Sequence, residues 1–559
     1  MIYMKFKFYY IVLLLSLFLY CNCFAFEEKK VIRVGISNQN FSSQIFKNAD
    51  FISNAEIRII DMAQNLSIAN VEANKQLNVT FQDGNLILSV ANGKSYDNLQ
   101  GPILLSSNDN IGIVGLNRKG TPARYRGMVE IKIAPNSQGF NIINIIDIEN
   151  YLRGVVPNEM PISFGLEALK AQAIAARNYA TNASISPNYD VTDSTASQVY
   201  YGVNSYKDIT DKAIMETIGI YALYNEKPIS ALYFSTSVGI TDDWDDVFAQ
   251  NNEGLHPYLK ARYDNPKQKP LNTEKDVIEF LSKKDTGYDT ISPKFRWEFT
   301  FTKQELEETL HNTLQQQSKA GLVTPKYDGD IKLEGLKEIK PIKRTQSGKV
   351  VELLISSNSG DYKVKKELGI RRVLKKGNNI LPSANFYIET PDANENKVLG
   401  IFDFSETYPE TYIIKGGGFG HGVGMSQFGA YALAKAGKKY PEILHHYYTD
   451  IILSTIPKDV HFNDYNYWYK TDFYFDKNIF KNAYLYIDNK NRCQEFNFKI
   501  NDLDFLDTPQ YAHNKSMKID ITKYLKSGMN TVDFAPLTLK DKGKTVSYRI
   551  EFIENGSRQ

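Results

Sequence analysis

The stretch V-V-P-N-E-M-P-I-S-F-G-L-E-A-L-K-A-Q-A-I-A-A-R-N-Y-A, residues 155–180, places one carboxylate, Glu159, among apolar neighbours before an alanine-rich segment. Proline fixes φ and restricts the residue before it, so Pro157 and Pro161 predict a rigid extended turn over residues 155–162. Such a turn would hold the Glu159 carboxyl in one place, as an active site requires. The alternative is a surface glutamate in a turn beside a structural helix, and the spacing alone favours that alternative.

The alanine-rich segment is predicted to form a helix with Ser163 as its N-cap. Apolar residues recur at steps of three and four and predict a buried stripe, made of Leu166, Leu169, Ala173, Ala176 and Ala180. Lys170 and Arg177 lie seven residues apart and share another face of this helix. The small side chains would let a neighbouring element approach closely. The helix could therefore hold the Glu159 acid beside cations.

Three further blocks follow this stretch. They are D-S-T-A-S-Q-V-Y at 193–200, A-L-Y-F-S-T-S at 231–237, and K-G-G-G-F-G-H-G-V-G-M-S-Q-F-G-A-Y-A-L-A-K-A-G-K-K-Y-P-E-I-L-H-H-Y-Y at 415–448. Together with residues 155–180, and in the same order, these blocks resemble the motifs of the SpoIID/LytB family. That family comprises stage II sporulation protein D and the amidase enhancer LytB. The resemblance covers about residues 125–451, so the two ends of the chain need their own argument.

The resemblance implies a peptidoglycan lytic transglycosylase that prefers strands already stripped of peptides, with Glu159 as its catalytic residue. The motif is matched by Asn158-Glu159-Met160, with Asn158 where the family would have Ser or a similar small polar residue. Most glycosidases need two carboxylates. Here one acid would protonate the glycosidic oxygen and then, as carboxylate, deprotonate the C6 hydroxyl that attacks C1 of N-acetylmuramic acid. Apolar neighbours would raise the pKa of Glu159 by desolvation, namely Val156, Met160, Ile162 and Phe164.

The other polar residues of these blocks are interpreted as contacts to the sugar. The candidate substrate-binding residues are Lys170, Arg177, Gln198, Ser235, Ser237, His421, Ser426 and Gln427. His421 is the one imidazole among the glycines of residues 416–424 and is expected to touch substrate. Lys170 and Arg177 would either hold the Glu159 segment or meet acetamido and lactyl groups. Short polar side chains at a strand end, such as Ser235, suit sugar contacts and backbone capping equally. We expect these blocks to converge on one groove.

A second interpretation is not enzymatic. LytB-like members are described as enhancers of a cell-wall amidase, so the same cleft could bind glycan and recruit or stimulate such an amidase. The retained Glu159 favours the enzyme, because a scaffold would not require an acid there. A purely structural envelope protein, the third interpretation, would explain export and β domains but not the four blocks.

No cofactor and no metal are expected. The glycine-rich residues 416–424 fit neither G-x-G-x-x-G nor a Gly-Lys-Ser/Thr ending, so the nucleotide-binding motifs are not met. The acidic run T-D-D-W-D-D at 241–246 lacks the glycine and terminal glutamate of a calcium loop and is interpreted as a solvated loop. Cleavage of a leader after Ala25 would leave Cys493 alone, which excludes a disulfide framework and a multi-cysteine zinc site.

The chain of 559 residues carries 66 basic and 64 acidic residues, a net charge of +2, so nucleic acid is not an expected partner. Lys5 and Lys7 precede an apolar run over residues 8–20 and a small-residue site ending at Ala25, which together predict an export signal. We therefore expect the protein in the periplasm, cell envelope or cell surface. Its expected partners are peptidoglycan glycan strands and, in the enhancer interpretation, a cell-wall amidase. A membrane would be a partner only if the leader stayed uncleaved.

The expected fold class is α+β and β-rich, a mixed SpoIID-like core with few helices flanked by an N-terminal β domain and a C-terminal β-sandwich. The expected domains are a signal peptide (1–25), a β domain (26–128), a catalytic core (129–456) with an insertion around 265–400, and a sandwich (460–559). This sandwich is interpreted either as a glycan-binding module or as a structural cap.

Local signals support this division. Asp83-Gly84 predicts a hairpin turn, and the runs at 129–133 and 140–148 predict a second hairpin that leads straight into the Glu159 element. Residues 302–305 form a capping box that predicts a helix start. Tyrosine- and phenylalanine-rich runs beyond residue 457 predict the strands of the sandwich.

Overall fold

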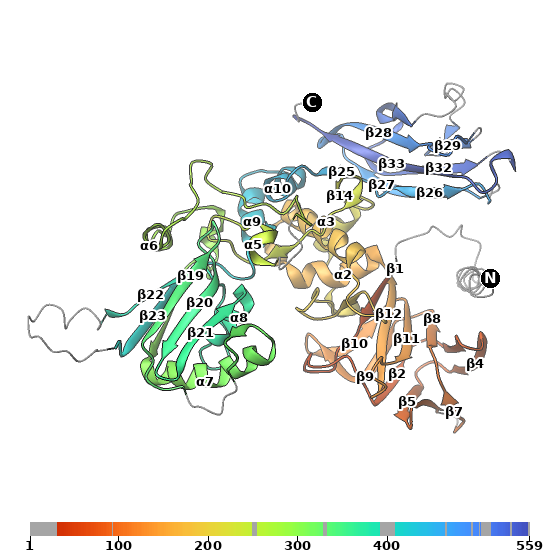
Figure 1. Ribbon diagram of the computed structural model, residues 1–559. Coiled ribbons are helices and arrows are strands. Elements are labelled where there is room, and N and C mark those ends of the chain that lie inside the picture. Colours follow the sequence, from red (N-terminus) through yellow and green to blue (C-terminus); the bar gives the residue numbers. More distant parts are fainter. Residues whose placement is uncertain are drawn as a thin grey trace, which may run out of the picture.

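Figure 1 shows the computed structural model of the chain. It describes residues 31–91, 93–248, 254–327, 333–391, 408–463, 467–493, 496–501, 503–504, 516–536 and 539–556. Strand content exceeds helix content, 38% against 23%, which confirms the β-rich α+β class. Within these ranges no helix has the length and apolar character needed to cross a membrane. The expected signal peptide, residues 1–25, lies outside the described residues.

The N-terminal part forms two sheets at the lower right of Figure 1. One has the order β13-β1-β12-β11-β8-β3-β4 and the other β10-β9-β2-β5-β6-β7. Antiparallel pairing of β5 with β6 and of β11 with β12 confirms both predicted hairpins. The strands are β1 (Val31–Gly35), β2 (Asn48–Ile52), β3 (Ile57–Asp61), β4 (Leu66–Val71), β5 (Gln76–Gln82), β6 (Asn85–Val90), β7 (Ser95–Leu99), β8 (Ile103–Ser107), β9 (Ile111–Arg118), β10 (Thr121–Tyr125), β11 (Met128–Ile133), β12 (Phe140–Asp147) and β13 (Val191–Thr192).

The first of these sheets runs through the expected domain boundary at residue 128. Strand β1 pairs with β12 and β8 pairs with β11, so residues on both sides of the boundary share one ladder. Local sequence patterns carry no signal for pairing between strands as far apart as β1 and β12. Because β12 leads directly into the helix that carries Glu159, this sheet supports the candidate site.

A group of helices occupies the centre of Figure 1. They are α2 (Ile148–Glu159), α3 (Leu166–Asn182), α4 (Asp208–Met215), α5 (Trp244–Val247), α9 (Gln427–Lys435) and α10 (Tyr440–Tyr447). Helix α3 contacts α2, α4, α9 and α10. Beside them, β16 (Tyr233–Phe234) and β24 (Met425–Ser426) form a short parallel pair that joins two of the sequence blocks.

The insertion at the lower left of Figure 1 has its own hydrophobic core, which includes Phe301, Leu310 and Ile414. Its sheets have the orders β17-β23-β22 and β18-β21-β20-β19. Thr302 and Glu305 form the predicted capping box at the start of α7. The elements are α6 (Glu274–Ser282), β17 (Trp297–Thr302), α7 (Lys303–Lys319), β18 (Val323–Thr324), β19 (Glu338–Arg344), β20 (Val350–Ser357), β21 (Gly360–Lys365), α8 (Glu367–Val373), β22 (Phe386–Glu389) and β23 (Thr411–Gly416).

The C-terminal strands form two sheets at the upper right of Figure 1, with orders β15-β14-β25-β33-β28-β31 and β27-β32-β29-β30. Aromatic contacts such as Phe473 with Phe552 join the two sheets. The first sheet also contains β14 and β25, so the expected boundary near residue 456 runs through it. The strands are β14 (Tyr221–Tyr224), β15 (Lys227–Pro228), β25 (Ile452–Ser454), β26 (Lys458–His461), β27 (Tyr469–Phe475), β28 (Phe480–Asp488), β29 (Phe496–Ile500), β30 (Leu503–Asp504), β31 (Met517–Asp520), β32 (Gly528–Pro536) and β33 (Thr545–Glu554).

Candidate active site

Glu159 is the last residue of helix α2, so the extended turn predicted over residues 155–162 is wrong for most of its length. Asp147 starts the helix by accepting a hydrogen bond from the backbone N–H of Asn150 at 3.1 Å. Pro157 lies inside the last turn, because its fixed φ is compatible with a helix and its ring removes a single backbone donor. Met160 then adopts extended angles before Pro161, which ends the helix directly after Glu159.

Helix α3 does not begin at Ser163, which lies in a short 3₁₀ turn of residues 162–164. The cap position is Gly165, at a φ of 86° that favours glycine, and it makes no side-chain cap hydrogen bond. The helix is buried around most of its circumference between residues 168 and 178, where a single stripe was predicted. Its alanines allow neighbouring helices to pack on several sides.

Two hydrogen bonds hold the carboxyl of Glu159, which is a half-buried residue. The backbone N–H of Val199 donates to Oε1 at 2.5 Å, and the Tyr233 hydroxyl also donates to the carboxyl. Burial raises the pKa of Glu159 to about 7, although these two donors act in the opposite direction by favouring the carboxylate. A group with a pKa near neutrality can give up and take back a proton at physiological pH.

A buried relay of side chains orients Tyr233. The Tyr151 hydroxyl donates to Gln198 Oε1 at 3.0 Å, and Gln198 Nε2 donates to the Tyr233 hydroxyl at 3.0 Å. The Tyr233 proton is then directed at Glu159. Gln198 is fully buried, so it acts on Glu159 through Tyr233, whereas the sequence suggested a sugar contact.

Sequence reasoning missed Tyr233, Tyr151 and the Val199 N–H as parts of this site. Tyr233 and Val199 lie in the quoted blocks 231–237 and 193–200, so the blocks contained the signal. Nothing in the spacing singled out a tyrosine or a backbone donor, because their roles depend on how distant segments pack.

His421 also forms a hydrogen bond with Tyr233, at its backbone carbonyl. Its Nε2 donates to the Tyr233 carbonyl at 3.1 Å, and its Nδ1 accepts from the Val423 N–H at 3.1 Å. Burial, with a smaller effect of Lys349, lowers the pKa of His421 to about 4, so the ring is neutral at pH 7. Because both ring nitrogens are engaged, His421 holds the strand that carries Tyr233. The substrate contact expected from the sequence stays a prediction.

Gln427 holds the backbone of Glu159. Its Nε2 donates to the backbone carbonyl of Glu159 at 2.8 Å and to Gln172 at 3.2 Å. Ser426 is the N-cap of α9, and its hydroxyl accepts from the Gly429 N–H at 3.3 Å. These contacts give Ser426 and Gln427 supporting roles within the protein.

All four blocks therefore meet at Glu159 through hydrogen bonds. Block 193–200 supplies Val199 and Gln198, block 231–237 supplies Tyr233, and block 415–448 supplies His421 and Gln427. Residues 136–224 match the family model described as stage II sporulation protein, SpoIID, and residues 243–424 match a model described as a domain of unknown function (DUF8618). The segment 136–224, which contains Glu159, thus belongs to the SpoIID family.

Relatives of this chain carry two kinds of name. It is 32% identical over 318 residues to the amidase enhancer of Bacillus subtilis (strain 168), an alignment that covers 54% of this chain and 40% of that protein. It is 28% identical over 322 residues to stage II sporulation protein D of the same organism, covering 54% of this chain and 73% of that protein. The aligned region thus spans less than half of the amidase enhancer.

Lys170 and Arg177 of α3 do not contact the Glu159 carboxyl. Lys170 is buried and pairs with Glu216 at 2.6 Å and Glu167 at 3.3 Å. Arg177 is also buried and pairs with Glu149 at 2.7 Å. The expected arrangement of an acid beside these cations is therefore wrong, because each cation is neutralised by another glutamate inside the helical core.

Ser235 and Ser237 hold backbone at the end of β16. The Ser235 carbonyl accepts from the Phe428 N–H at 3.0 Å, and the Ser235 hydroxyl lies 3.2 Å from that of Thr236. The Ser237 hydroxyl accepts from the Gly239 N–H at 2.9 Å. Of the two interpretations left open by the sequence, the structure displays backbone capping by the Ser237 hydroxyl, whereas the Ser235 hydroxyl contacts that of Thr236.

The acidic run at 241–246 is partly buried, contrary to the solvated loop that was expected. Asp242 is 1% exposed and lies 3.4 Å from the Nζ of buried Lys349. Residues 244–247 form α5. In the described part of the chain, no group of three or more His, Cys, Asp or Glu side chains is arranged to hold a metal ion.

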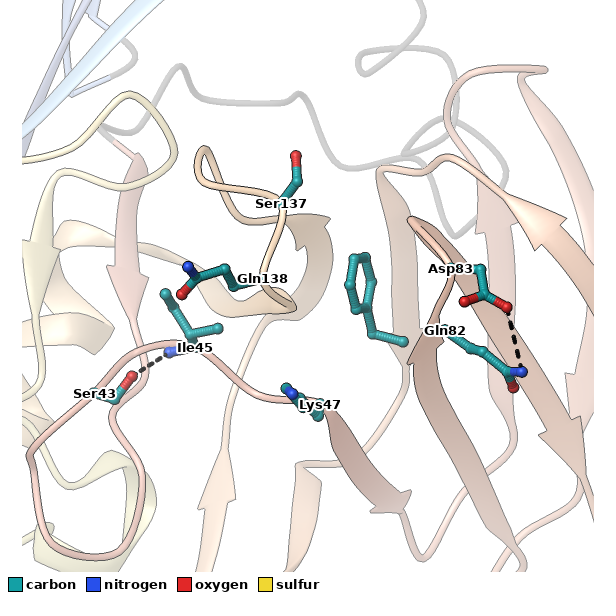
Figure 2. A pocket seen from close by; sticks show the side chains of 8 residues that line it. Ser43, Ile45, Lys47, Gln82, Asp83, Ser137 and Gln138 are labelled. Carbon is teal, nitrogen blue, oxygen red and sulfur yellow. Dashed lines mark hydrogen bonds between the residues drawn. The ribbon is translucent and has the colours of Figure 1, made fainter.

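An open groove of about 660 Å³ lies elsewhere, in the N-terminal sheets (Figure 2). It lies between the segment before β2, the β5–β6 turn and the β11–β12 turn. Its lining residues are Ser43, Ile45, Lys47, Phe81, Gln82, Asp83, Ser137 and Gln138. None of the residues around Glu159 lines this groove, so it is separate from the candidate active site.

Proposed function

We propose that this protein is a peptidoglycan lytic transglycosylase that cleaves peptide-stripped glycan strands and leaves 1,6-anhydro-muramic acid ends. The observation that carries the proposal is Glu159, one carboxyl held by Val199 and Tyr233 with a pKa of about 7. A single group of this kind can serve first as acid and then as base. A hydrolytic glycosidase of the usual type would need a second carboxylate.

In the first step the protonated Glu159 donates its proton to the glycosidic oxygen, and the bond from that oxygen to C1 of N-acetylmuramic acid breaks. The carboxylate that remains receives hydrogen bonds from Val199 and Tyr233, which favour the charged form. In the second step it accepts the proton of the C6 hydroxyl while that oxygen bonds to C1. Glu159 is protonated again and no water is consumed.

The residues around Glu159 hold its carboxyl in place for these two proton transfers. Gln427 holds the backbone of Glu159, while the relay from Tyr151 through Gln198 fixes the hydroxyl of Tyr233. A general acid must stay within hydrogen-bond reach of its target atom, and rigid support of this kind provides that precision.

The product tests the proposal. The chain without its leader is incubated with peptide-free glycan strands, and the new ends are examined by mass spectrometry. The mechanism predicts 1,6-anhydro ends, lighter by one water than reducing ends. Reducing ends would contradict the proposal, because they would require a hydrolase with a second carboxylate.

The second candidate is an enhancer of a cell-wall amidase, favoured by the name of the relative that is 32% identical. Here the same surface would bind glycan and stimulate an added amidase without cleaving strands. Stimulation of an amidase on intact peptidoglycan, together with no cleavage of denuded strands, would favour this candidate.

Both candidates require export, which we propose from Lys5, Lys7 and the apolar run that follows them. Cell fractionation should find the protein outside the cytoplasm, in the periplasm, envelope or on the cell surface. Full-length soluble protein in the cytoplasm would contradict a role on peptidoglycan.

A further inference from the structure

One buried carboxyl of the insertion joins two elements that support Glu159. Asp289 lies in a 3₁₀ turn, Tyr288–Ile291, and is fully buried. Its Oδ1 accepts from the backbone N–H of Ser237 at 2.8 Å and from the hydroxyl of Ser426. Buried acceptors that satisfy buried donors in this way fix the relative position of the segments they join.

Ser237 and Ser426, the two partners of Asp289, each lie close in sequence to a residue that donates a hydrogen bond to Glu159. Ser237 follows β16, whose Tyr233 donates to the Glu159 carboxyl. Ser426 caps α9, whose first residue Gln427 donates to the Glu159 carbonyl. Asp289 therefore fastens β16 to the start of α9, and these two elements approach Glu159 at its carboxyl and at its backbone.

The surroundings of Asp289 leave little freedom. A side chain at Gly429 would lie 2.9 Å from Asp289 Oδ2 and would overlap the Tyr447 hydroxyl, so α9 packs directly on the carboxyl. Burial, followed by the charge of Asp264, raises the pKa of Asp289 well above its usual range. Both hydrogen bonds end on one acceptor atom, Oδ1, so an asparagine could supply the same oxygen acceptor.

We propose that Asp289 is a positioning residue of the candidate active site, which the insertion supplies to hold Tyr233 and Gln427 on Glu159. It lies in the segment 243–424, outside the segment 136–224 that matches the SpoIID model. The segment that contains Glu159 is then not sufficient for a complete site. This inference rests on the proposed function for its kinetic readout.

The kinetic test compares substitutions at one position. Asp289→Asn keeps an acceptor for Ser237 and Ser426 and should keep kcat within about threefold of the original chain. Asp289→Ala should lower kcat about 10- to 100-fold with KM little changed, because small misplacement of a reacting group has effects of this size. The exposed Asp285→Ala, four residues earlier, is the matched control and should change neither parameter. An Asn variant as inactive as the Ala variant would overturn the proposal.

A second readout does not depend on cleavage. Amide hydrogen exchange in peptides covering residues 233–240 and 425–435 should be faster in Asp289→Ala and unchanged in Asp289→Asn. Unchanged exchange in the Ala variant would overturn the positioning role, whether or not the chain cleaves glycan. Absence of cleavage by the original chain would instead contradict the proposed function alone.

The Ala variant could fail to fold. Ser426→Ala then removes one of the two hydrogen bonds to Asp289 Oδ1, the one from the Ser426 hydroxyl, while leaving Asp289 in place. It should lower kcat and speed exchange over residues 425–435, and wild-type values for both would overturn the proposal.

Discussion

Glu159 lies between opposing influences on its proton. Burial favours the neutral acid, whereas the Val199 N–H and the Tyr233 hydroxyl favour the carboxylate. The resulting pKa of about 7 means that the acid form needed for the first step predominates below pH 7 and is lost above it. We therefore predict that kcat/KM falls tenfold per pH unit above about pH 7. A pH profile on denuded strands checks this, and a constant rate up to pH 9 would contradict it.

Substitution of Tyr233 gives a second test of what sets the pKa of Glu159. Its hydrogen bond lowers the pKa of Glu159, so Tyr233→Phe should raise that pKa and move the alkaline limit of activity to higher pH. The same change leaves the developing carboxylate without one donor, and kcat should fall about tenfold or more, since hydrogen bonds to charged groups are worth about 1.5–3 kcal/mol. A limit that moves to lower pH would show that the direction of this interaction is misassigned.

At the residue scale, sequence reasoning found the carboxylate and its raised pKa but assigned its neighbours poorly. Glu159 was recognisable because its block and apolar neighbours are contiguous in the chain. Lys170 and Arg177 looked available because the spacing of a helix does not reveal the acids Glu216 and Glu149 that neutralise them. His421 and Gln198 were expected to contact the sugar, and in the structure both hydrogen-bond to Tyr233, a partner that the sequence did not single out.

At the level of elements, the glycine-rich segment depends on close approach of two backbones. Gly424 has a φ of 79°, and a Cβ there would overlap the Leu232 carbonyl oxygen. That oxygen accepts from the Met425 N–H at 3.0 Å and from the Tyr448 hydroxyl at 2.9 Å. A side chain at position 424 would therefore separate β16 from β24, the pair that carries Tyr233.

Gly424→Ala should lower the midpoint of thermal unfolding by more than Gly437→Ala does. Gly437 also has a positive φ, 87°, but a Cβ there would meet nothing within 4 Å. The control thus measures the backbone cost alone, about 1–2 kcal/mol. Equal shifts for the two variants, measured by calorimetry, would contradict the close packing at Gly424.

Turns and helix starts were predictable where a short pattern of neighbouring residues determines them. The Asp83-Gly84 turn and the Thr302 capping box follow from short patterns, and both are confirmed. The helical ending at Glu159 was not predicted, because Pro157 is compatible with both an extended turn and the last turn of a helix. Helix α2 packs against α3 in the folded chain, which local sequence patterns do not reveal.

On the scale of the whole molecule, one continuous hydrophobic core joins regions that were expected to be separate domains. Val34, Tyr151 and Phe552 belong to the same cluster, although they lie in the N-terminal sheet, the central helices and the C-terminal sheet. The insertion has a second cluster. Composition and turn signals cannot reveal shared sheets of this kind, because pairing strands such as β1 and β12, or β14 and β25, lie far apart in the chain.

Removal of residues 458–559 should therefore destabilise the central helices. The deletion takes away β33, which pairs with β25 through Leu453–Phe552 and Ser454–Glu551, and uncovers part of the shared core. The shortened chain should unfold at lower temperature than the full chain and be cleaved faster in limited proteolysis around residues 148–182. An unchanged unfolding midpoint would show that the C-terminal sheets are an independent domain.

We propose that Glu159 transfers the proton in strand cleavage, and a substitution that removes only this proton tests the proposed role. Glu159→Gln keeps the size of the side chain and an acceptor for Val199 but cannot donate the proton. Formation of 1,6-anhydro ends should fall by about 10²-fold or more, the usual contribution of general acid–base catalysis, while binding to denuded strands persists. Glu279→Gln, at an exposed position of α6, should leave the rate unchanged. Anhydro ends formed by Glu159→Gln at the rate of the original chain would contradict this role of Glu159.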